Sequence, residues 1–258
     1  MADWARKFFR PGGGDALLAY ILFGDFGQLA ACSASRYDTA GLPDGVQVGM
    51  NLRAEQPELF DEWETGPFGD QLRASGLYDA VAGSKAMLRV LGSVGDPESL
   101  DYLRDSVGVV TCLLDQGGVC VLDLQTFRWW SPADWTSQIF AAHEPQPRRH
   151  AVILFSDEEA APGLSWYHTR GMRKFGRPDL SVHAVPPDLA PAVIDLLNRF
   201  IEMEAFGAII DEGQEIRMAS LPEGLTCRHG GELEDPDFNN VHVEIVWPAG
   251  SPGSGRVD

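Results

Sequence analysis

The sequence predicts an α+β fold in which mixed, mainly antiparallel sheets pack against a few helices, with two halves forming one compact body. Short apolar runs separated by turn residues dominate the chain, and helical patterns of moderate length lie between them. Of its 258 residues, 44% are hydrophobic and 22% are charged, which is typical of a globular protein with a sizeable core. The longest apolar stretch, residues 16–23, is far shorter than the roughly 20 residues of a membrane-spanning helix. No membrane segment is therefore expected.

The first half, residues 1–143, is predicted to alternate between strands and short helices. Gly24-Asp25 and Leu42-Pro43-Asp44-Gly45 are typical turn sequences. Ser131-Pro132-Ala133-Asp134 is typical of a helix start, because serine caps the first turn and proline suits its first position. Strands are expected over 17–23, 29–34, 46–50 and 86–94, and helices over 57–63, 97–105 and 132–140.

A β-hairpin is predicted near the end of this half. The apolar runs 107–114 and 119–124 are joined through Gln116-Gly117-Gly118, a sequence that favours a tight turn. In such a hairpin Cys112 and Cys120 point to opposite faces, so they could not form a disulfide. Four cysteines are also too few for a disulfide scaffold in a chain of this length. All four are therefore expected to be buried free thiols.

The second half is predicted to be a C-terminal α+β part over 148–247. The proline-rich segment 144–149 is the best linker candidate, and the Gly- and Pro-rich tail 248–258 is expected to be disordered. The longest helix is expected over 188–206, because apolar residues recur there on one helical face and Gly207 follows. Strands are expected over 151–155, 165–170, 180–185, 216–221 and 242–247.

The charge of the chain is strongly acidic. It contains 20 Lys and Arg against 38 Asp and Glu, a formal net charge of −18. This charge repels phosphate backbones and anionic membranes, so binding to nucleic acid or to a membrane surface is not expected. An acidic surface suits a basic protein partner. The N-terminal residues show no apolar export signal, so the expected location is the cytoplasm.

One short segment reverses this charge. Arg170, Arg173, Lys174 and Arg177 lie within eight positions that contain no acidic residue. Gly171 and Gly176 give the backbone between them conformational freedom, so amide groups could join the cations around a small anion. If the protein is an enzyme, His168 is the candidate general acid or base. Alternatively, the four cations pair with carboxylates of the same chain.

The same segment carries a resemblance to a known family. His168-Thr169-Arg170-Gly171-Met172-Arg173-Lys174-Phe175-Gly176-Arg177-Pro178-Asp179-Leu180 resembles the signature of an uncharacterised bacterial domain-of-unknown-function family of the 4261 type. In that family the signature follows a strand and precedes a long helix. The resemblance covers mainly residues 151–216. It implies a fold but no activity, because the family has no established catalytic or binding residues.

A second polar group lies near the C-terminus. His242 and Glu244 share one face of a predicted strand, and Cys227 and His229 precede them. These residue types bind transition metals, but their spacing matches no metal motif. We therefore expect neither a metal nor another cofactor.

No catalytic motif is recognisable in the chain. A Gly-x-Ser-x-Gly nucleophile motif is absent, and Gly12-Gly13-Gly14 is not followed by the Lys-Ser/Thr pair of a phosphate loop. The first functional hypothesis is a soluble acidic binding protein without catalytic activity, of the immunity or inhibitor type, for a basic partner. The alternative is an enzyme that holds a small phosphate or carboxylate metabolite with its Arg-rich signature.

Overall fold

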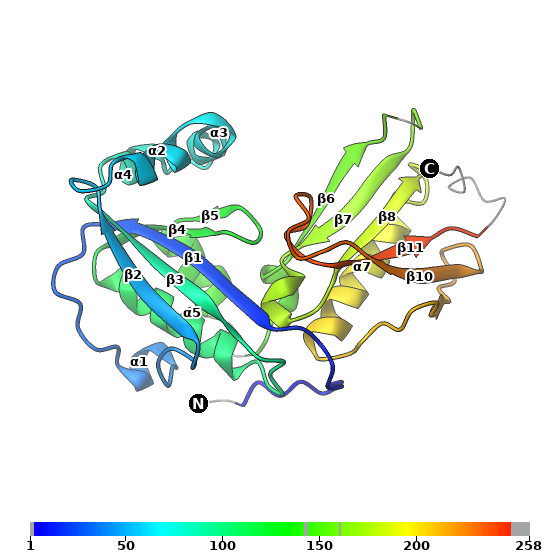
Figure 1. The fold of residues 1–258 in the computed structure, drawn as a ribbon, viewed down its shortest axis with the longest axis horizontal. Coiled ribbons are helices and arrows are strands. Elements are labelled where there is room, and N and C mark those ends of the chain that lie inside the picture. Colours follow the sequence, from blue (N-terminus) through cyan, green and yellow to red (C-terminus); the bar gives the residue numbers. More distant parts are fainter. Residues whose placement is uncertain (1–2, 142–143, 160, 249–258) are drawn as a thin grey trace. The chain divides into compact units, whose positions relative to one another are not determined.

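The computed structural model describes residues 3–141, 144–159 and 161–248, and it confirms the α+β fold with two mostly antiparallel sheets (Figure 1). The chain divides into two units. Unit 1 contains residues 1–5 and 16–146, and unit 2 contains residues 6–15 and 147–258. The sequence prediction placed all of residues 1–143 together. Residues 6–15 belong to unit 2 instead, because the amide groups of Phe8 and Arg10 donate hydrogen bonds to the carbonyls of Phe206 and Gly207.

Unit 1 is built on a five-stranded antiparallel sheet with the strand order β2-β3-β1-β4-β5. Side chains of β1 alternate between its two faces, so Tyr20 points to one face and Ile21 and Phe23 to the other. The predicted strands 17–23, 46–50, 86–94 and 119–124 are all present. The bounds are β1 (Ala16–Gly24), β2 (Val46–Leu52), β3 (Ala86–Val94), β4 (Gly118–Asp123) and β5 (Arg128–Trp130).

Helices cover both faces of this sheet. The long helix α5 (Asp101–Asp115) and α6 (Pro132–Trp135), which continues as a π-helix over Thr136–Phe140, cover the face of Tyr20. The short helices α2 (Glu58–Glu64), α3 (Gly66–Ala74) and α4 (Tyr78–Ala82) pack on the face of Phe23. In agreement with the predicted helix start, the Ser131 side chain accepts a hydrogen bond from the Asp134 amide at 3.0 Å.

Two expectations for unit 1 are wrong. Residues 107–114 form the C-terminal half of α5 rather than a hairpin strand, so that helix starts later and runs further than the predicted 97–105. Almost every residue of α5 after Asp101 is buried, so the helix lacks the polar stripe that distinguishes a surface helix from a buried strand. Residues 29–33 form no strand, and Ala34 begins the short helix α1 (Ala34–Tyr37).

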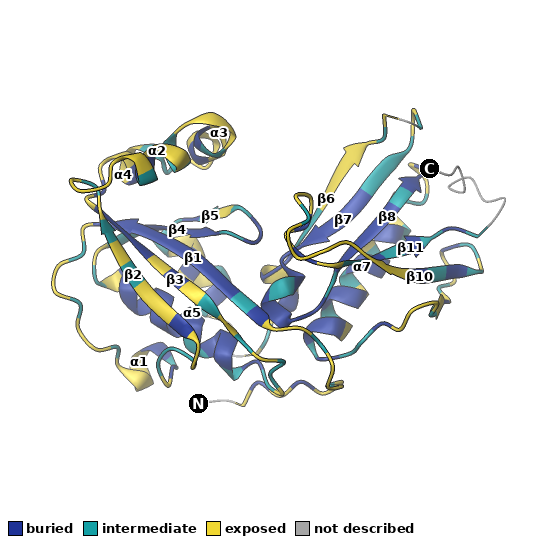
Figure 2. Ribbon diagram, in the orientation of Figure 1, coloured by how far each residue is buried: buried dark blue, intermediate teal, exposed yellow. Residues whose placement is uncertain are grey.

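Unit 2 contains a six-stranded sheet with the order β6-β7-β8-β11-β10-β9, in which only the β8–β11 pair is parallel. Helix α7 (Ala190–Ala205) packs on one face, where Leu197 and Phe200 contact a core formed by alternate strand residues. Figure 2 shows this buried centre and the exposed outer strand β6. The strands are β6 (Val152–Asp157), β7 (Ser165–Arg170), β8 (Asp179–Val185), β9 (Glu215–Ile216), β10 (Leu225–Gly230) and β11 (His242–Val246).

The last predicted elements have mixed outcomes. The strand expected over 216–221 is limited to β9, and the polar strand β10 was not predicted. The predicted tail lies outside the described residues after Pro248. In the described ranges, no helix combines the length and the apolar character that crossing a membrane requires.

Candidate functional site

The basic signature forms a tight corner between β7 and β8. Gly171 and Gly176 have positive φ angles of 107° and 61° and enclose the single-turn helix Met172–Phe175. The Asp179 carboxylate accepts hydrogen bonds from the Thr169 hydroxyl at 2.8 Å and from the Met172 amide at 3.3 Å. Glycine is required at both hinges because other residues resist this backbone conformation. The local sequence therefore specifies a folded corner.

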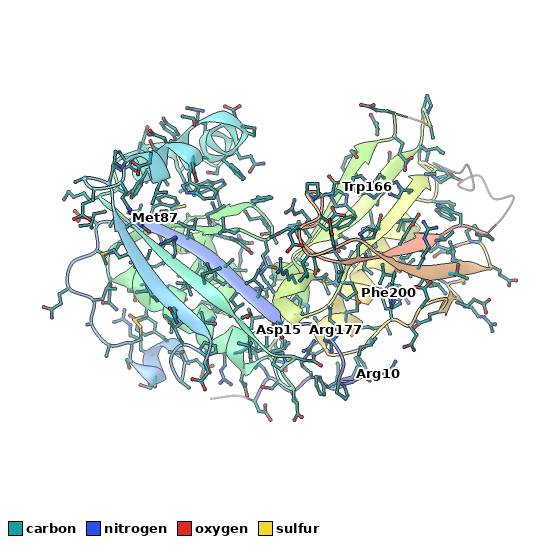
Figure 3. The ribbon with its side chains drawn as sticks, in the orientation of Figure 1. Arg10, Asp15, Met87, Trp166, Arg177 and Phe200 are labelled. Carbon is teal, nitrogen blue, oxygen red and sulfur yellow. A yellow bond between two sulfur atoms is a disulfide. The ribbon has the colours of Figure 1, made fainter. Side chains whose placement is uncertain are left out.

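Lys174 and Arg177 are buried parts of this corner. The Lys174 ammonium is fully buried and donates to the His150 carbonyl at 2.7 Å. The Arg177 guanidinium donates to the carbonyls of Gly207 and Ala208 at 3.0 Å each, beyond the C-terminus of α7. Figure 3 shows Arg177, which follows the C-terminal end of β7 in the chain, well away from Trp166 near the N-terminal end of this strand. Both cations thus donate hydrogen bonds to backbone carbonyl oxygens. The positive charge of Arg177 also lies at the C-terminus of α7, the negative end of the helix dipole.

The other two predicted anion-binding residues lie elsewhere. Arg173 donates to the Asn239 carbonyl at 2.9 Å. Arg170 is 8% exposed, and burial lowers its pKa although the charges of Asp179, Asp237 and Asp235 raise it. Lys174, Arg177 and Arg173 therefore donate to different backbone segments, whereas Arg170 lies in the field of the carboxylates of Asp179, Asp237 and Asp235. This geometry does not bring them around one small anion.

His168 belongs to a cluster of rings on the sheet face opposite α7. Its imidazole stacks on Trp166 with ring centroids 4.1 Å apart and meets the Phe238 ring edge-on at 5.4 Å. Burial lowers the pKa of His168 to about 4, and its Nδ1 atom has no hydrogen-bond partner among the described residues. A general acid or base works best with a pKa near the operating pH. The acid–base role of His168 therefore stays a prediction.

The C-terminal polar residues are also separated from one another. The Cys227 side chain is buried in the core on the α7 side, whereas the His229 ring contacts the Ile210 carbonyl at 2.8 Å. Glu244 forms an ion pair with Arg228, and His242 stacks on Phe238. Across the described ranges, no group of three or more His, Cys, Asp or Glu side chains could hold a metal ion.

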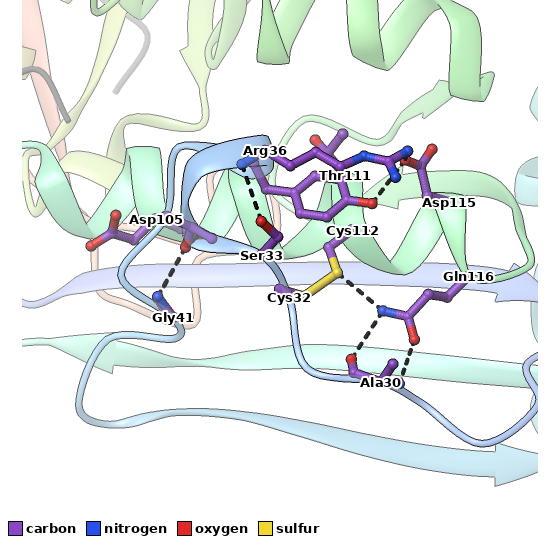
Figure 4. The surroundings of a disulfide bond; sticks show 12 residues. Ala30, Cys32, Ser33, Arg36, Gly41, Asp105, Thr111, Cys112, Asp115 and Gln116 are labelled. Carbon is purple, nitrogen blue, oxygen red and sulfur yellow. Dashed lines mark hydrogen bonds and ion pairs between the residues drawn. A yellow bond between two sulfur atoms is a disulfide. The ribbon is translucent and has the colours of Figure 1, made fainter.

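Cys32 and Cys112 form a disulfide, which corrects the prediction of four free thiols (Figure 4). The reason is that Cys112 lies on α5 rather than on a hairpin strand, and its side chain faces the segment that precedes α1. The Cα atoms of the two cysteines are 5.8 Å apart. Cys120 and Cys227 are free and buried, and burial raises the pKa of their thiols to about 12 and about 11. Both thiols therefore stay protonated and unreactive near neutral pH.

The disulfide fastens a long loop along α5. Gln116 exchanges two hydrogen bonds with the backbone of Ala30, and Asp115 accepts from Arg36 at 2.6 Å and from the Tyr37 hydroxyl at 2.9 Å. These contacts follow the same side of α5 as Cys112. Unlike the Cys112–Cys120 pair, Cys32 and Cys112 are far apart in the sequence, so no spacing pattern indicated their bond.

A further candidate surface is the outer side of α2, α3 and α4, which we call the acidic helical face. The same stretch of the sequence contains exposed carboxylates and half-buried aromatic rings. The Phe68 ring contacts Trp63 and Phe127 at centroid distances of 5.2 and 5.1 Å. Phe127 holds a positive φ angle of 53°, a strained conformation for a large side chain that is often found at functional surfaces. The exposed carboxylates are those of Glu55, Glu58, Asp61, Glu62, Asp70 and Asp79.

Sequence reasoning missed this surface because α3 and α4 were not predicted. Gly66, Pro67 and Gly69 lie in α3, and such residues usually indicate a loop. The density of acidic residues between 55 and 79 was the signal that could have located it.

Comparison with known proteins adds no relative. No protein-family model, no curated protein and no solved structure matches the chain. The resemblance of residues 168–180 to a family signature therefore stays a prediction.

Proposed function

We propose that this chain is an acidic binding protein of the inhibitor or immunity type, and that its acidic helical face binds a basic protein partner. The observation that carries the proposal is the charge of this face. Residues 54–84 contain seven acidic residues and one cation, Arg73, which is held by Asp70 at 3.1 Å. A surface of one charge sign attracts an oppositely charged partner and speeds its encounter.

The negative charge of the whole chain is also concentrated in unit 1, which contains this face. Unit 1 carries 19 of the 38 acidic residues but 7 of the 20 cations, a net charge of −12, whereas unit 2 has a net charge of −6. A basic partner is therefore attracted mainly to unit 1.

The aromatic rings beside the carboxylates supply the second element of a binding surface. Protein interfaces combine aromatic anchors at the centre with a polar rim. Trp63 and Phe68 are half-buried, so they offer apolar area while their packing keeps them rigid. Carboxylates of Asp61, Glu62 and Asp70 are exposed close to them in the sequence. Steering by charge and anchoring by rings would thus occur on one surface.

The experiment compares two double variants that change the net charge equally. Asp61→Lys/Glu62→Lys reverses two charges on the acidic helical face. Asp44→Lys/Glu98→Lys reverses two exposed charges at the opposite end of the sheet, where β2 starts and β3 ends. Immobilised wild type and both variants are exposed to extract of the native host at about 50 and about 300 mM salt. Captured proteins are identified by mass spectrometry, and association rates are then measured with the purified partner.

The proposal expects a basic protein that wild type and the control variant capture equally well. Asp61→Lys/Glu62→Lys should weaken its binding at least about tenfold, mainly through slower association. An equal loss of binding in both variants would mean that net charge alone, and not the acidic helical face, determines binding. Equal binding by both variants, or a captured partner without a basic surface, would contradict the proposal.

A further inference from the structure

Strand β6 forms an exposed edge of the six-stranded sheet in unit 2. It is hydrogen-bonded to β7 along one side, and no described strand lies along its other side. Two of its apolar side chains reach solvent, since Leu154 is 39% and Phe155 is 70% exposed. The opposite edge is the two-residue strand β9.

Apart from its charged last residue, Asp157, the edge lacks the features that usually prevent pairing between sheets. Natural edge strands are protected by charged side chains, proline, bulges or very short length. Residues 151–156 of this chain contain neither charge nor proline, and β6 pairs with β7 over six residues without a register shift. An edge of this length and apolar character is a template for another strand.

We propose that two copies of this chain pair antiparallel through their β6 edges, forming one continuous sheet across a twofold axis. Opposed residues of an antiparallel pair share a face, so the register must oppose residues of equal parity. Placing Leu154 on the axis opposes Leu154 to its own copy and Ile153 to Phe155. This register buries the exposed apolar groups of both strands against each other.

The charges that flank β6 favour a second copy as the occupant. The exposed cations Arg148, which also pairs with Glu202, and Arg149 precede the strand, the exposed carboxylate of Asp157 ends it, and that of Glu159 follows it. In an antiparallel pair centred on Leu154, the basic segment before β6 of one copy lies near the acidic end of β6 of the other. A strand with basic residues before it and acidic residues after it is thus complementary to itself.

The net charge sets the conditions of the test. Each copy carries a net charge of −18, so long-range repulsion opposes association at low salt. At physiological ionic strength the Debye length is about 8 Å, which leaves mainly the local charge pairs. The full chain is therefore measured by sedimentation equilibrium in such a buffer, at concentrations up to about 100 μM.

The register is tested by cysteine cross-linking. Opposed Cα atoms in an antiparallel pair lie about 4.5–5.5 Å apart, within the range of a disulfide, whereas diagonal neighbours are more than about 7 Å apart. The native cysteines do not compete, because Cys32 is bonded to Cys112 and the other two are buried. With oxidised glutathione, Leu154→Cys should form a covalent dimer. Ile153→Cys and Phe155→Cys should form one only when the two variants are mixed.

Two further variants separate pairing from folding. Leu154→Lys adds a charge at the edge and should weaken dimerisation at least tenfold, with an unchanged circular dichroism spectrum because the side chain is exposed. Met203→Lys, at an exposed position on α7, should leave the dimer intact. A wild type that stays monomeric at the highest concentration would overturn the proposal, as would a dimer that Leu154→Lys leaves unchanged. Cross-linking without the stated register dependence would also overturn it.

Discussion

The buried carboxyl group of Glu204 gives the sharpest test of the physical picture of unit 2. Glu204 lies near the end of α7 with its side chain fully buried, and neither carboxyl oxygen has a hydrogen-bond partner among the described residues. Burial and the nearby charge of Asp179 raise the pKa of Glu204 well above its ordinary value of 4.5, and Arg177 opposes them. The folded protein therefore holds this group protonated at pH values where the unfolded chain has released the proton.

The substitution Glu204→Gln removes the titration and keeps the shape. Because the folded-state pKa is raised, the stability of wild type that depends on this proton is complete below pH 4.5 and declines as the pH rises. The decline is about 1.4 kcal/mol per pH unit until the folded-state pKa is reached. Glutamine is neutral throughout this range. The stability of Glu204→Gln relative to wild type should therefore increase from pH 5 to pH 7, by up to about 1.4 kcal/mol for each pH unit below the folded-state pKa.

The assay is urea unfolding followed by tryptophan fluorescence at pH 5, 6 and 7. Both units contain tryptophans, Trp166 and Trp247 being those of unit 2, so separate transitions of the two units are both visible and are fitted independently. The matched control is Glu202→Gln, because Glu202 lies on the same helix but is partly exposed and paired with Arg148 at 2.7 Å. Loss of that surface pair should cost at most about 1 kcal/mol at each pH. A Glu204→Gln effect that is flat with pH, or that decreases toward pH 7, would refute the reasoning.

Three further predictions follow from other contacts. Cys32→Ser should lower the free energy of unfolding of unit 1 by about 4.5 kcal/mol, because the disulfide closes a long loop of 80 residues. Denaturation of wild type and variant without reductant measures this loss, and equal stabilities would contradict the prediction. Lys174→Met should lower the free energy of unfolding by about 1–3 kcal/mol, because it leaves the His150 carbonyl unpaired. Neither Lys174→Met nor Arg173→Ala should change the effect of phosphate on the melting temperature, and a phosphate effect that Arg173→Ala abolishes would support the anion site. Burial and Lys174 lower the pKa of His150 to about 3 from 6.5, so the stability of the folded protein declines as the pH falls below 6.5. The stability of His150→Gln relative to wild type should therefore rise by about 2 kcal/mol from pH 7 to pH 5, and a constant difference would contradict the prediction.

The sequence predicted elements well where residues alternate in their environment. Strands β1 and β3 and helix α7 each show a regular pattern of apolar positions that matches one buried side or a fully buried run, whereas Val48, Met50 and Leu52 of β2 are exposed. Helix α5 defeated this reasoning because it is buried on nearly all sides. Its Gly108 also has a role that only the folded chain reveals, since a Cβ atom there would come within 2.2 Å of the Tyr37 carbonyl oxygen. The loop held by the disulfide can approach α5 this closely only at glycine.

The candidate surfaces were harder to predict than the fold because they depend on tertiary neighbours. The cluster of cations was visible in the sequence, but whether it meets an anion or backbone carbonyls depends on segments far away, such as His150 and Gly207. Conversely, Trp63, Phe68 and Phe127 come from separate segments and form one row only when α3 packs beside the loop after β4. The exposure of β6 likewise depends on its position at the end of the strand order.

The contacts of the basic signature explain why such a segment can look like a functional motif. Gly171 and Gly176 are required by backbone angles, Lys174 and Arg177 by buried carbonyls, and Asp179 by the corner that it closes. Each position tolerates few residue types, so a chain with this corner needs a recognisable sequence block whatever it binds. Specificity must then come from surfaces that the corner does not constrain. The two surfaces proposed for binding in this chain, the acidic helical face and the β6 edge, lie outside the corner, and their exposed side chains can change without loss of the fold.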